Sequence, residues 1–213
     1  MWLLDTDDER LAEAATTCHS WIGVEERSRA ARLRDPCAVR RAELGFALRR
    51  AVLSRYQTLA PSEWLFEPDT RGKPRVLSPD TPLQFSVSHS GRWLACAVAH
   101  GAAVGVDVEV PRTADYLRLS RRFYDPGEHA VLQGMAADSR RDRFYVLWVL
   151  KEAALKRVGL GLSGGLDRFR FEVDGGRIEG RDGADGTEKP AFFLWRLTGG
   201  AHLALCAGDG ATV

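Results

Sequence analysis

The sequence predicts an α+β fold made of two similar halves, which we place at residues 1–102 and 103–213. Two observations predict this fold. Stretches with apolar residues at the helical period come before stretches that alternate as strands do, and this order occurs twice along the chain. A chain of 213 residues is long enough to bury one large core or two small cores packed together.

The first half is expected to open with a short strand and then to run through helices into strands. Asp35 and Pro36 mark the start of its longest helix, because Asp caps helix N-termini and Pro fits the first helical position. Leu44, Leu48 and Val52 follow near the helical period and predict a core-facing helix. The expected helices are 8–21, 24–33 and 36–56, and the expected strands are 2–4, 64–66, 83–87 and 93–99.

The second half repeats this plan after a first strand at 104–110. Residues 144–150 are apolar all round, which predicts that the last helix is buried there. The glycine-rich segments 174–176 and 182–186 are typical of hairpin turns or loops. The expected helices are 115–124, 126–135 and 138–157, and the expected strands are 169–173, 192–197 and 202–206.

Composition excludes several classes of protein. No apolar run approaches the length of a membrane span, and the first five residues reach an acid too soon for a secretory signal, so we expect a cytoplasmic protein. The cysteines are scattered and form no Cys-x-x-Cys pair, which indicates neither a zinc site nor a disulfide framework. They are Cys18, Cys37, Cys96 and Cys206.

The basic residues are unevenly distributed. The net charge of +1 argues against a surface built for nucleic acid, yet residues 27–55 are rich in arginine. That run fits either a solvated helical face or a patch for phosphates. Only four of the 30 basic residues are lysine, and three of them lie in the motifs below. A compact ammonium is not replaced well by the planar guanidinium group.

A pair of acids lies on the predicted strand at 104–110. Alternation places Asp107 and Glu109 together on the face opposite Val106 and Val108. One interpretation is a half-buried strand that shows its acids to water. The other is a divalent-cation site, since no cation adjoins the acids along the strand to relieve their repulsion. Oxygen ligands without His or Cys favour magnesium over zinc.

A second set of charges follows the apolar part of the last helix. Trp148, Glu152 and Lys156 are four residues apart and share a face, with Lys151 one step round. An exposed Glu–Lys pair is one interpretation. Because the preceding turns are buried, a cleft is the other.

The segment 85–91 runs from a predicted strand into a turn that contains Ser88, His89 and Ser90. A serine hydrolase would need a Gly-x-Ser-x-Gly elbow, and the segment 85–91 contains none. A phosphate cradle and a simple polar turn both remain open. Residues 71–74 taken alone indicate only a turn.

Together these segments resemble the Sfp-type, surfactin-synthetase-activating class of 4′-phosphopantetheinyl transferases. The resemblance lies in the identity, order and spacing of the motifs at 72–74, 85–90, 104–109, 148–156 and 159–163. The two ends of the chain agree only in general character. Departures are mild: Ser86 stands where Asn is common, and Ala42 where a hydroxyl residue helps to bind phosphate.

The resemblance implies a fold of two α+β halves related by a pseudo-twofold axis, with the active site in the cleft between them. It implies that Asp107, Glu109 and Glu152 hold Mg²⁺ with the pyrophosphate of coenzyme A, and that Asp107, Glu152 and Lys156 are catalytic. Glu152 is expected as a metal ligand, as the base for the attacking serine, or as both. The implied phosphate contacts are Arg29, Arg41, Lys73, Ser88, His89, Lys151 and Lys156.

The implied reaction converts an apo carrier into a holo carrier, as a holo-[acyl-carrier-protein] synthase does. A serine of an acyl or peptidyl carrier protein attacks coenzyme A, and adenosine 3′,5′-bisphosphate leaves. Such enzymes serve fatty-acid, polyketide or nonribosomal peptide synthesis. We expect a monomer with no nucleic-acid or membrane partner. Two alternatives stay open: a metal-dependent phosphodiesterase that uses the same acids with water, and an arginine-rich module that binds nucleotides or nucleic acids.

Overall fold

The computed structural model describes residues 1–161, 164–182 and 189–208. Its first half contains β1 (Trp2–Asp5), α1 (Arg10–Trp21), α2 (Val24–Ala30), α3 (Pro36–Leu53), η1 (Pro61–Glu63), β2 (Leu65–Pro68), β3 (Pro74–Ser78), β4 (Leu83–Ser90) and β5 (Trp93–His100). Its second half contains β6 (Val104–Glu109), α4 (Tyr116–Phe123), α5 (Pro126–Gly134), α6 (Ala137–Val158), η3 (Leu166–Arg168), β7 (Phe169–Asp174), β8 (Arg177–Asp182), β9 (Ala191–Arg196), η4 (Thr198–Gly200) and β10 (His202–Ala207).

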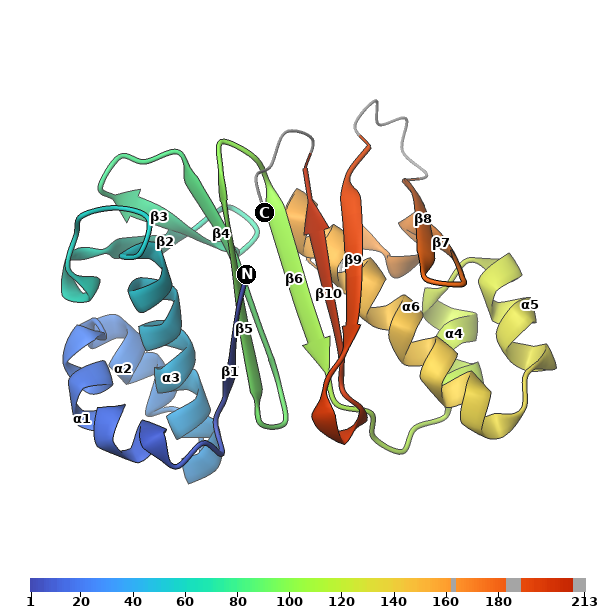
Figure 1. Cartoon of the computed structure of the whole chain (residues 1–213), viewed down its shortest axis with the longest axis horizontal. Coiled ribbons are helices and arrows are strands. Elements are labelled where there is room, and N and C mark those ends of the chain that lie inside the picture. The colour runs from blue at the N-terminus through green and yellow to red at the C-terminus, as the bar shows by residue number, and fades with distance from the viewer. Residues whose placement is uncertain (162–163, 183–188, 209–213) are drawn as a thin grey trace.

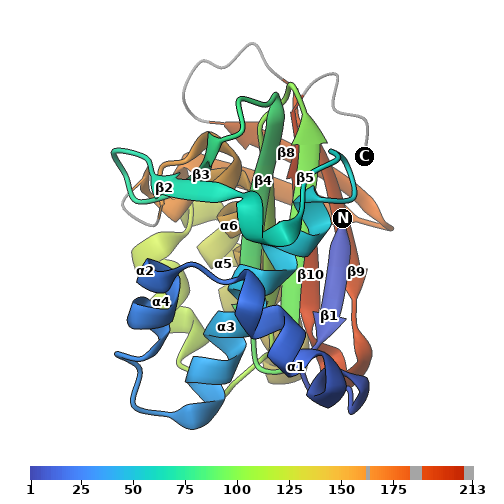
Figure 2. The same cartoon turned by 90° about the vertical axis from the view of Figure 1, so that its left-hand side faces the viewer.

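The elements form layers, with two antiparallel sheets in the middle and helices outside them (Figure 1). The strand orders are β1-β5-β4 and β6-β10-β9. Helices α1 to α3 cover one sheet and α4 to α6 flank the other, and Figure 2 shows α3 in front of β4 and β5. The predicted α+β fold is therefore confirmed. No helix of the described residues is both long enough and apolar enough to span a bilayer.

Two strands were not expected from the sequence. β3 pairs with β2, and β8 pairs with β7, as two separate antiparallel hairpins. β8 has no run of apolar residues and contains Gly180, so its sequence lacks the pattern of a half-buried strand. Its pairing with β7 is what makes it a strand. The expected turn at 174–176 is confirmed, whereas most of the expected loop at 182–186 lies outside the described residues.

β4 and β6 connect the two sheets through side chains. Backbone N–H groups of β6 and of the residue after it donate to serine hydroxyls of β4 instead of to its carbonyls. These bonds run from Val106 to Ser86 (3.1 Å), from Val108 to Ser88 (3.3 Å) and from Val110 to Ser90 (3.0 Å). We call Ser86, Ser88 and Ser90 the serine ladder. It brings the polar end of β4 next to the acids of β6.

Apolar packing holds the two sheets and α6 in place. Small and branched side chains of β5, β6 and β10 form one buried cluster, which includes Ala95, Val106 and Leu203. α6 contributes to a second buried cluster and packs against β6. Leu150 and Ala153 of this helix are fully buried, as the apolar run at 144–150 predicts for the helix core.

The close approach of α6 to β6 requires glycine at position 105. A Cβ atom built on Gly105 would overlap the carbonyl oxygen of Ala153 and crowd the backbone nitrogen of Arg157. Neither backbone atom can move without displacing the helix. We therefore expect Gly105→Ala to lower the free energy of unfolding by about 3 kcal/mol, at the upper end of typical overpacking costs.

The measurement is urea denaturation of Gly105→Ala beside Gly134→Ala. Gly134 ends α5, and its added Cβ would meet no atom within 4 Å. The control should therefore keep its stability. Equal midpoints for the two variants would contradict the proposed steric requirement at position 105.

Candidate active site

A pocket of about 240 Å³ is lined by residues of four of the five sequence motifs. It is lined by residues 71–74 and 85–87 from the first half and by Lys156, Gly159 and Gly161 from the second. The hairpin β2–β3, strand β4 and the end of α6 supply these residues. Motifs far apart in the chain therefore share one cavity.

Asp107 lies beside this pocket with only 4% of its surface exposed. Its Oδ1 accepts hydrogen bonds from Ser88 Oγ at 2.8 Å and from Lys156 Nζ at 2.7 Å. Its Oδ2 is buried and has no hydrogen-bond partner among the described residues. A cation does adjoin the acid, but it comes from α6 and not from the strand itself.

Glu109 stands two residues further along β6. Its Oε2 accepts a hydrogen bond from Ser90 Oγ at 2.8 Å. Burial raises the pKa of the Glu109 carboxyl, and the bond from Ser90 opposes that change. The nearby charge of Asp107 raises the pKa of Glu109 further. The two strand acids therefore act on each other, as their alternation predicts.

Glu152 approaches the same acids from α6. Burial, followed by repulsion from Asp107, raises the pKa of Glu152 to about 7. Its carboxylate makes no hydrogen bond or ion pair with the residues that the structure describes. Lys156, four residues later, pairs with Asp107 and not with Glu152. An isolated surface Glu–Lys pair on one helix is thereby excluded.

The three carboxylates fit a divalent cation in two respects. The buried Oδ2 of Asp107 has no partner among the described residues, and the pKa of Glu152 is raised first by burial and then by repulsion from Asp107, both of which a bound cation would offset. Oxygen donors of this kind suit Mg²⁺. In the described ranges no group of three His, Cys, Asp or Glu side chains is already gathered in metal-binding geometry.

The polar groups of Ser88 and Lys73 are both hydrogen-bonded within the protein at the site. The Ser88 hydroxyl donates to Asp107 and accepts from Val108 N–H and from Lys156 Nζ, so its bonding capacity is full. Lys73 Nζ donates to the backbone oxygen of Lys156 at 2.6 Å, at the C-terminal end of α6. Burial lowers the pKa of Lys73. Lys73 lines the pocket, whereas the Ser88 hydroxyl is already fully bonded within the protein.

His89 faces away from the serine ladder, because neighbouring residues of a strand point to opposite sides. Burial lowers its pKa, and the positive charges of Lys156 and Arg41 lower it further. Arg41 lies on α3 and forms a long ion pair of 3.7 Å with Asp35. The structure thus places His89 near the positive charges of Lys156 and Arg41.

Arg29 lies in a neighbouring pocket of about 520 Å³, which also contacts Gly72 and Pro74. The same pocket includes Arg49 and Arg50, which are both buried and both paired with Glu26. These two arginines therefore belong neither to a solvated face nor to a phosphate surface. Sequence reasoning missed their role because their acidic partner lies on a different helix.

Lys151 is a correction to the expected site. Its side chain is 0% exposed and points into the second half of the protein, where Nζ pairs with Glu128 Oε2 at 2.6 Å. It also donates to the backbone oxygens of Leu166 and Phe169. A phosphate of coenzyme A cannot reach this ammonium group. The expected contact is therefore wrong, and Lys151 joins α5, α6 and β7 instead.

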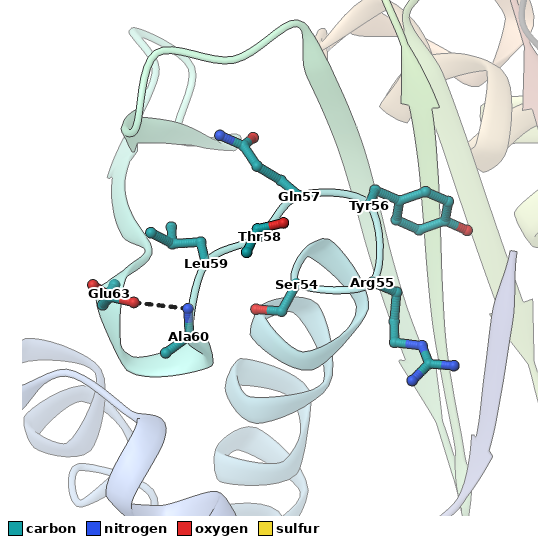
Figure 3. A pocket seen from close by; sticks show the side chains of 8 residues that line it. All are labelled: Ser54, Arg55, Tyr56, Gln57, Thr58, Leu59, Ala60 and Glu63. Carbon is teal, nitrogen blue, oxygen red and sulfur yellow. Dashed lines mark hydrogen bonds between the residues drawn. The ribbon is translucent and has the colours of Figure 1, made fainter.

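A larger pocket lies elsewhere. It measures about 650 Å³ and is lined by residues 54–60 and Glu63, between the end of α3 and η1 (Figure 3). One hydrogen bond between lining residues, drawn as a dashed line, runs from Ala60 N–H to Glu63 Oε2. None of the expected site residues lines it, so we place the active site at the smaller pocket.

Comparison with known proteins gives one consistent result. A family model of the 4′-phosphopantetheinyl transferase superfamily matches residues 103–206. The 4′-phosphopantetheinyl transferase Sfp of Bacillus subtilis (strain 168) is 36% identical over 193 residues, which cover 88% of this chain and 83% of that protein. The 4′-phosphopantetheinyl transferase HetI of Nostoc sp. is 32% identical over 164 residues, covering 75% and 67%.

A more distant likeness is found among solved structures. The holo-[acyl-carrier-protein] synthase (AcpS) of Thermotoga maritima overlays with a TM-score of 0.40 at 22% identity, covering 51% of this chain and 63% of that one. The sequence relatives, and not this overlay, are the basis for comparison.

Proposed function

This chain belongs to the 4′-phosphopantetheinyl transferase superfamily, and from that premise we propose that Asp107, Glu109 and Glu152 hold Mg²⁺ with the pyrophosphate of coenzyme A. The enzyme transfers the 4′-phosphopantetheine group of coenzyme A to a serine of a carrier protein. One observation carries the assignment of residues: motifs from both halves line one pocket, with Asp107 and Lys156 paired at its border. Neither the phosphodiesterase nor the nucleic-acid module is favoured by the relatives.

The finer description is part of the proposal. We place the site between the halves 1–102 and 103–213, since residues of both line the pocket. We propose a cytoplasmic monomer of the holo-[acyl-carrier-protein] synthase type, which acts on acyl or peptidyl carriers. No nucleic acid or membrane takes part in this reaction.

Phosphoryl transfer needs mainly alignment of the reactants and neutralisation of charge. Bound Mg²⁺ would neutralise charge on the pyrophosphate. Lys156, fixed by Ser88 and Asp107, would stabilise charge on the departing adenosine bisphosphate. Lys73, His89, Arg41 and Arg29 would bind phosphate groups from the basic side of the site.

We propose that Glu152 accepts the proton of the attacking serine. Its carboxylate makes no hydrogen bond or ion pair with the described residues, and in the metal-free protein its pKa is raised to about 7, so it is a candidate proton acceptor. The serine oxygen then bonds to the β-phosphorus, and the bond to the leaving phosphate oxygen breaks. In this proposal Glu152 also contributes to the metal site.

Mass spectrometry of an apo carrier protein tests the function. Incubation with coenzyme A, Mg²⁺ and the enzyme should add the phosphopantetheine mass to the carrier. A chelator should prevent the gain. Equal modification with the chelator present would contradict the magnesium site, and consumption of coenzyme A without any carrier would support the phosphodiesterase alternative.

Lys156→Arg tests whether the site needs a compact ammonium. Lys156 Nζ fits between Ser88 Oγ at 2.8 Å and Asp107 Oδ1 at 2.7 Å. The guanidinium group keeps the charge but is wider and planar. We therefore expect carrier modification to slow by about tenfold or more, equivalent to about 1.4 kcal/mol of transition-state stabilisation.

Lys189→Arg is the control for this change. Lys189 precedes Pro190 at an exposed position, apart from every motif. Its variant should work at the wild-type rate when both are measured at saturating Mg²⁺. Indistinguishable rates for Lys156→Arg and Lys189→Arg would exclude a specific requirement for lysine at position 156.

A further inference from the structure

The serine ladder does more than join the two sheets. Ser90 Oγ accepts a hydrogen bond from Val110 N–H at 3.0 Å and donates its own proton to Glu109 Oε2 at 2.8 Å. One hydroxyl therefore contacts both the backbone after β6 and a carboxylate of β6. The backbone bond fixes the oxygen, so the direction of the donated bond is fixed as well.

The same arrangement occurs two residues earlier. Ser88 Oγ accepts from Val108 N–H and donates to Asp107 Oδ1 at 2.8 Å. The repeat at every second residue follows from the pleat of both strands. Ser86 supplies a rung without a carboxylate: it accepts from Val106 N–H, and the residue before Val106 is Gly105, which has no side chain. The serine-to-carboxylate bonds are thus limited to the two rungs that face acids.

Holding Glu109 in one position has an energetic cost that Ser90 reduces. The Glu109 side chain is half-buried and lies near the like charges of Asp107 and Glu152. Repulsion would turn an unrestrained glutamate away from the other acids. A hydrogen bond from a hydroxyl to a charged carboxylate is stronger than one between neutral groups. Partners of this kind set the orientation of metal ligands.

We propose that Ser90 is a positioning residue that orients the Glu109 carboxylate toward Mg²⁺, an inference that rests on the proposed function. Ser88 orients Asp107 in the same way, but it also contacts Lys156. Ser90 therefore offers the cleaner test. Its hydroxyl has no contact with Lys156, and Glu109 is its only carboxylate partner within the described residues.

The experiment is calorimetric titration of Mg²⁺ into the enzyme saturated with coenzyme A, without carrier protein, so that no turnover occurs. Ser90→Ala should weaken Mg²⁺ binding by about tenfold or more, as the loss of such a supporting partner does at other metal sites. Ser90→Thr keeps the hydroxyl and should restore most of the affinity. Thermal unfolding of each metal-free variant reports the contribution of the ladder to stability.

Ser120→Ala is the matched control. It removes a buried serine hydroxyl of α4 that bonds to His129 and contacts none of the proposed site residues, so it should lose stability while keeping the Mg²⁺ affinity at saturating coenzyme A. Wild-type Mg²⁺ affinity in Ser90→Ala would overturn the positioning role and leave the transferase function standing. Equal weakening in Ser120→Ala would also overturn it, since the cause would then be a general loss of stability. Absence of Mg²⁺ binding by the wild-type protein with coenzyme A would instead overturn the proposed metal site.

Discussion

Asp107→Ala is expected to slow carrier modification by about a thousandfold, which corresponds to about 4 kcal/mol of transition-state stabilisation. The substitution removes the buried Oδ2, which has no hydrogen-bond partner among the described residues and is available to Mg²⁺. It also removes the acceptor that holds Lys156 and Ser88. Metal site and catalytic ammonium are therefore lost together. Steady-state rates at saturating Mg²⁺ measure the effect.

Stability separates this loss of activity from unfolding. In the strand alone, removing one of two neighbouring acids would relieve repulsion. In the folded protein it also leaves Lys156 and Ser88 without their acceptor, a loss of about 1–3 kcal/mol that the relieved repulsion partly offsets. Asp107→Asn keeps an oxygen for Ser88 and should unfold at nearly the wild-type temperature while remaining inactive. Near-normal magnesium-dependent activity in either variant would show that Asp107 is not in the metal site.

Glu152→Gln is expected to slow transfer by about a hundredfold or more, within the range of general-base contributions. The amide preserves the shape of the side chain but can neither accept the serine proton nor carry a negative charge to the metal. Magnesium titration with coenzyme A distinguishes the two roles, since only loss of a ligand weakens binding. An unchanged transfer rate would contradict both.

Although Glu152→Gln should slow transfer, we expect it to raise the stability of the metal-free protein. The pKa of Glu152 rises from 4.5 to about 7 on folding, so the folded state binds the proton more tightly than the unfolded state does. Its contribution to stability is present below pH 4.5 and is lost as the pH rises through about 7. Glutamine does not ionise, so Glu152→Gln should be more stable than the wild type at pH 8. At pH 5 the difference in unfolding temperature should be much smaller.

Local patterns in the sequence are sufficient to predict most elements of this fold. Alternation over 104–110 and the helical period in 36–56 and 138–157 depend only on neighbouring residues, and β6, α3 and α6 form there. The same periods place Asp107 and Glu109 on one face of a strand and Glu152 and Lys156 on one face of a helix. The chemistry of the site is therefore readable from residue types and spacing.

The choice of partners was decided only by the tertiary structure. Lys156 pairs with Asp107, which is 49 positions away, although Glu152 lies on its own helix face. Lys151 lies on the buried side of α6 and pairs with Glu128, whereas Glu152, the next residue, lies near Asp107 and Glu109. Successive residues of a helix are rotated by about 100°, so these two side chains point in different directions. The spacing of the residues alone does not determine which of the two directions faces the cleft.

The sequence by itself determined the order of elements, the two acids on β6 and the charged face of α6. Tertiary packing determined that Ser88 and Ser90 bond to those acids, that Arg49 and Arg50 are buried with Glu26, and that β8 becomes a strand. The physical reason is the range of the interactions. Backbone preference and side-chain period act over a few residues, whereas burial and ion pairing depend on which segments the folded chain brings together.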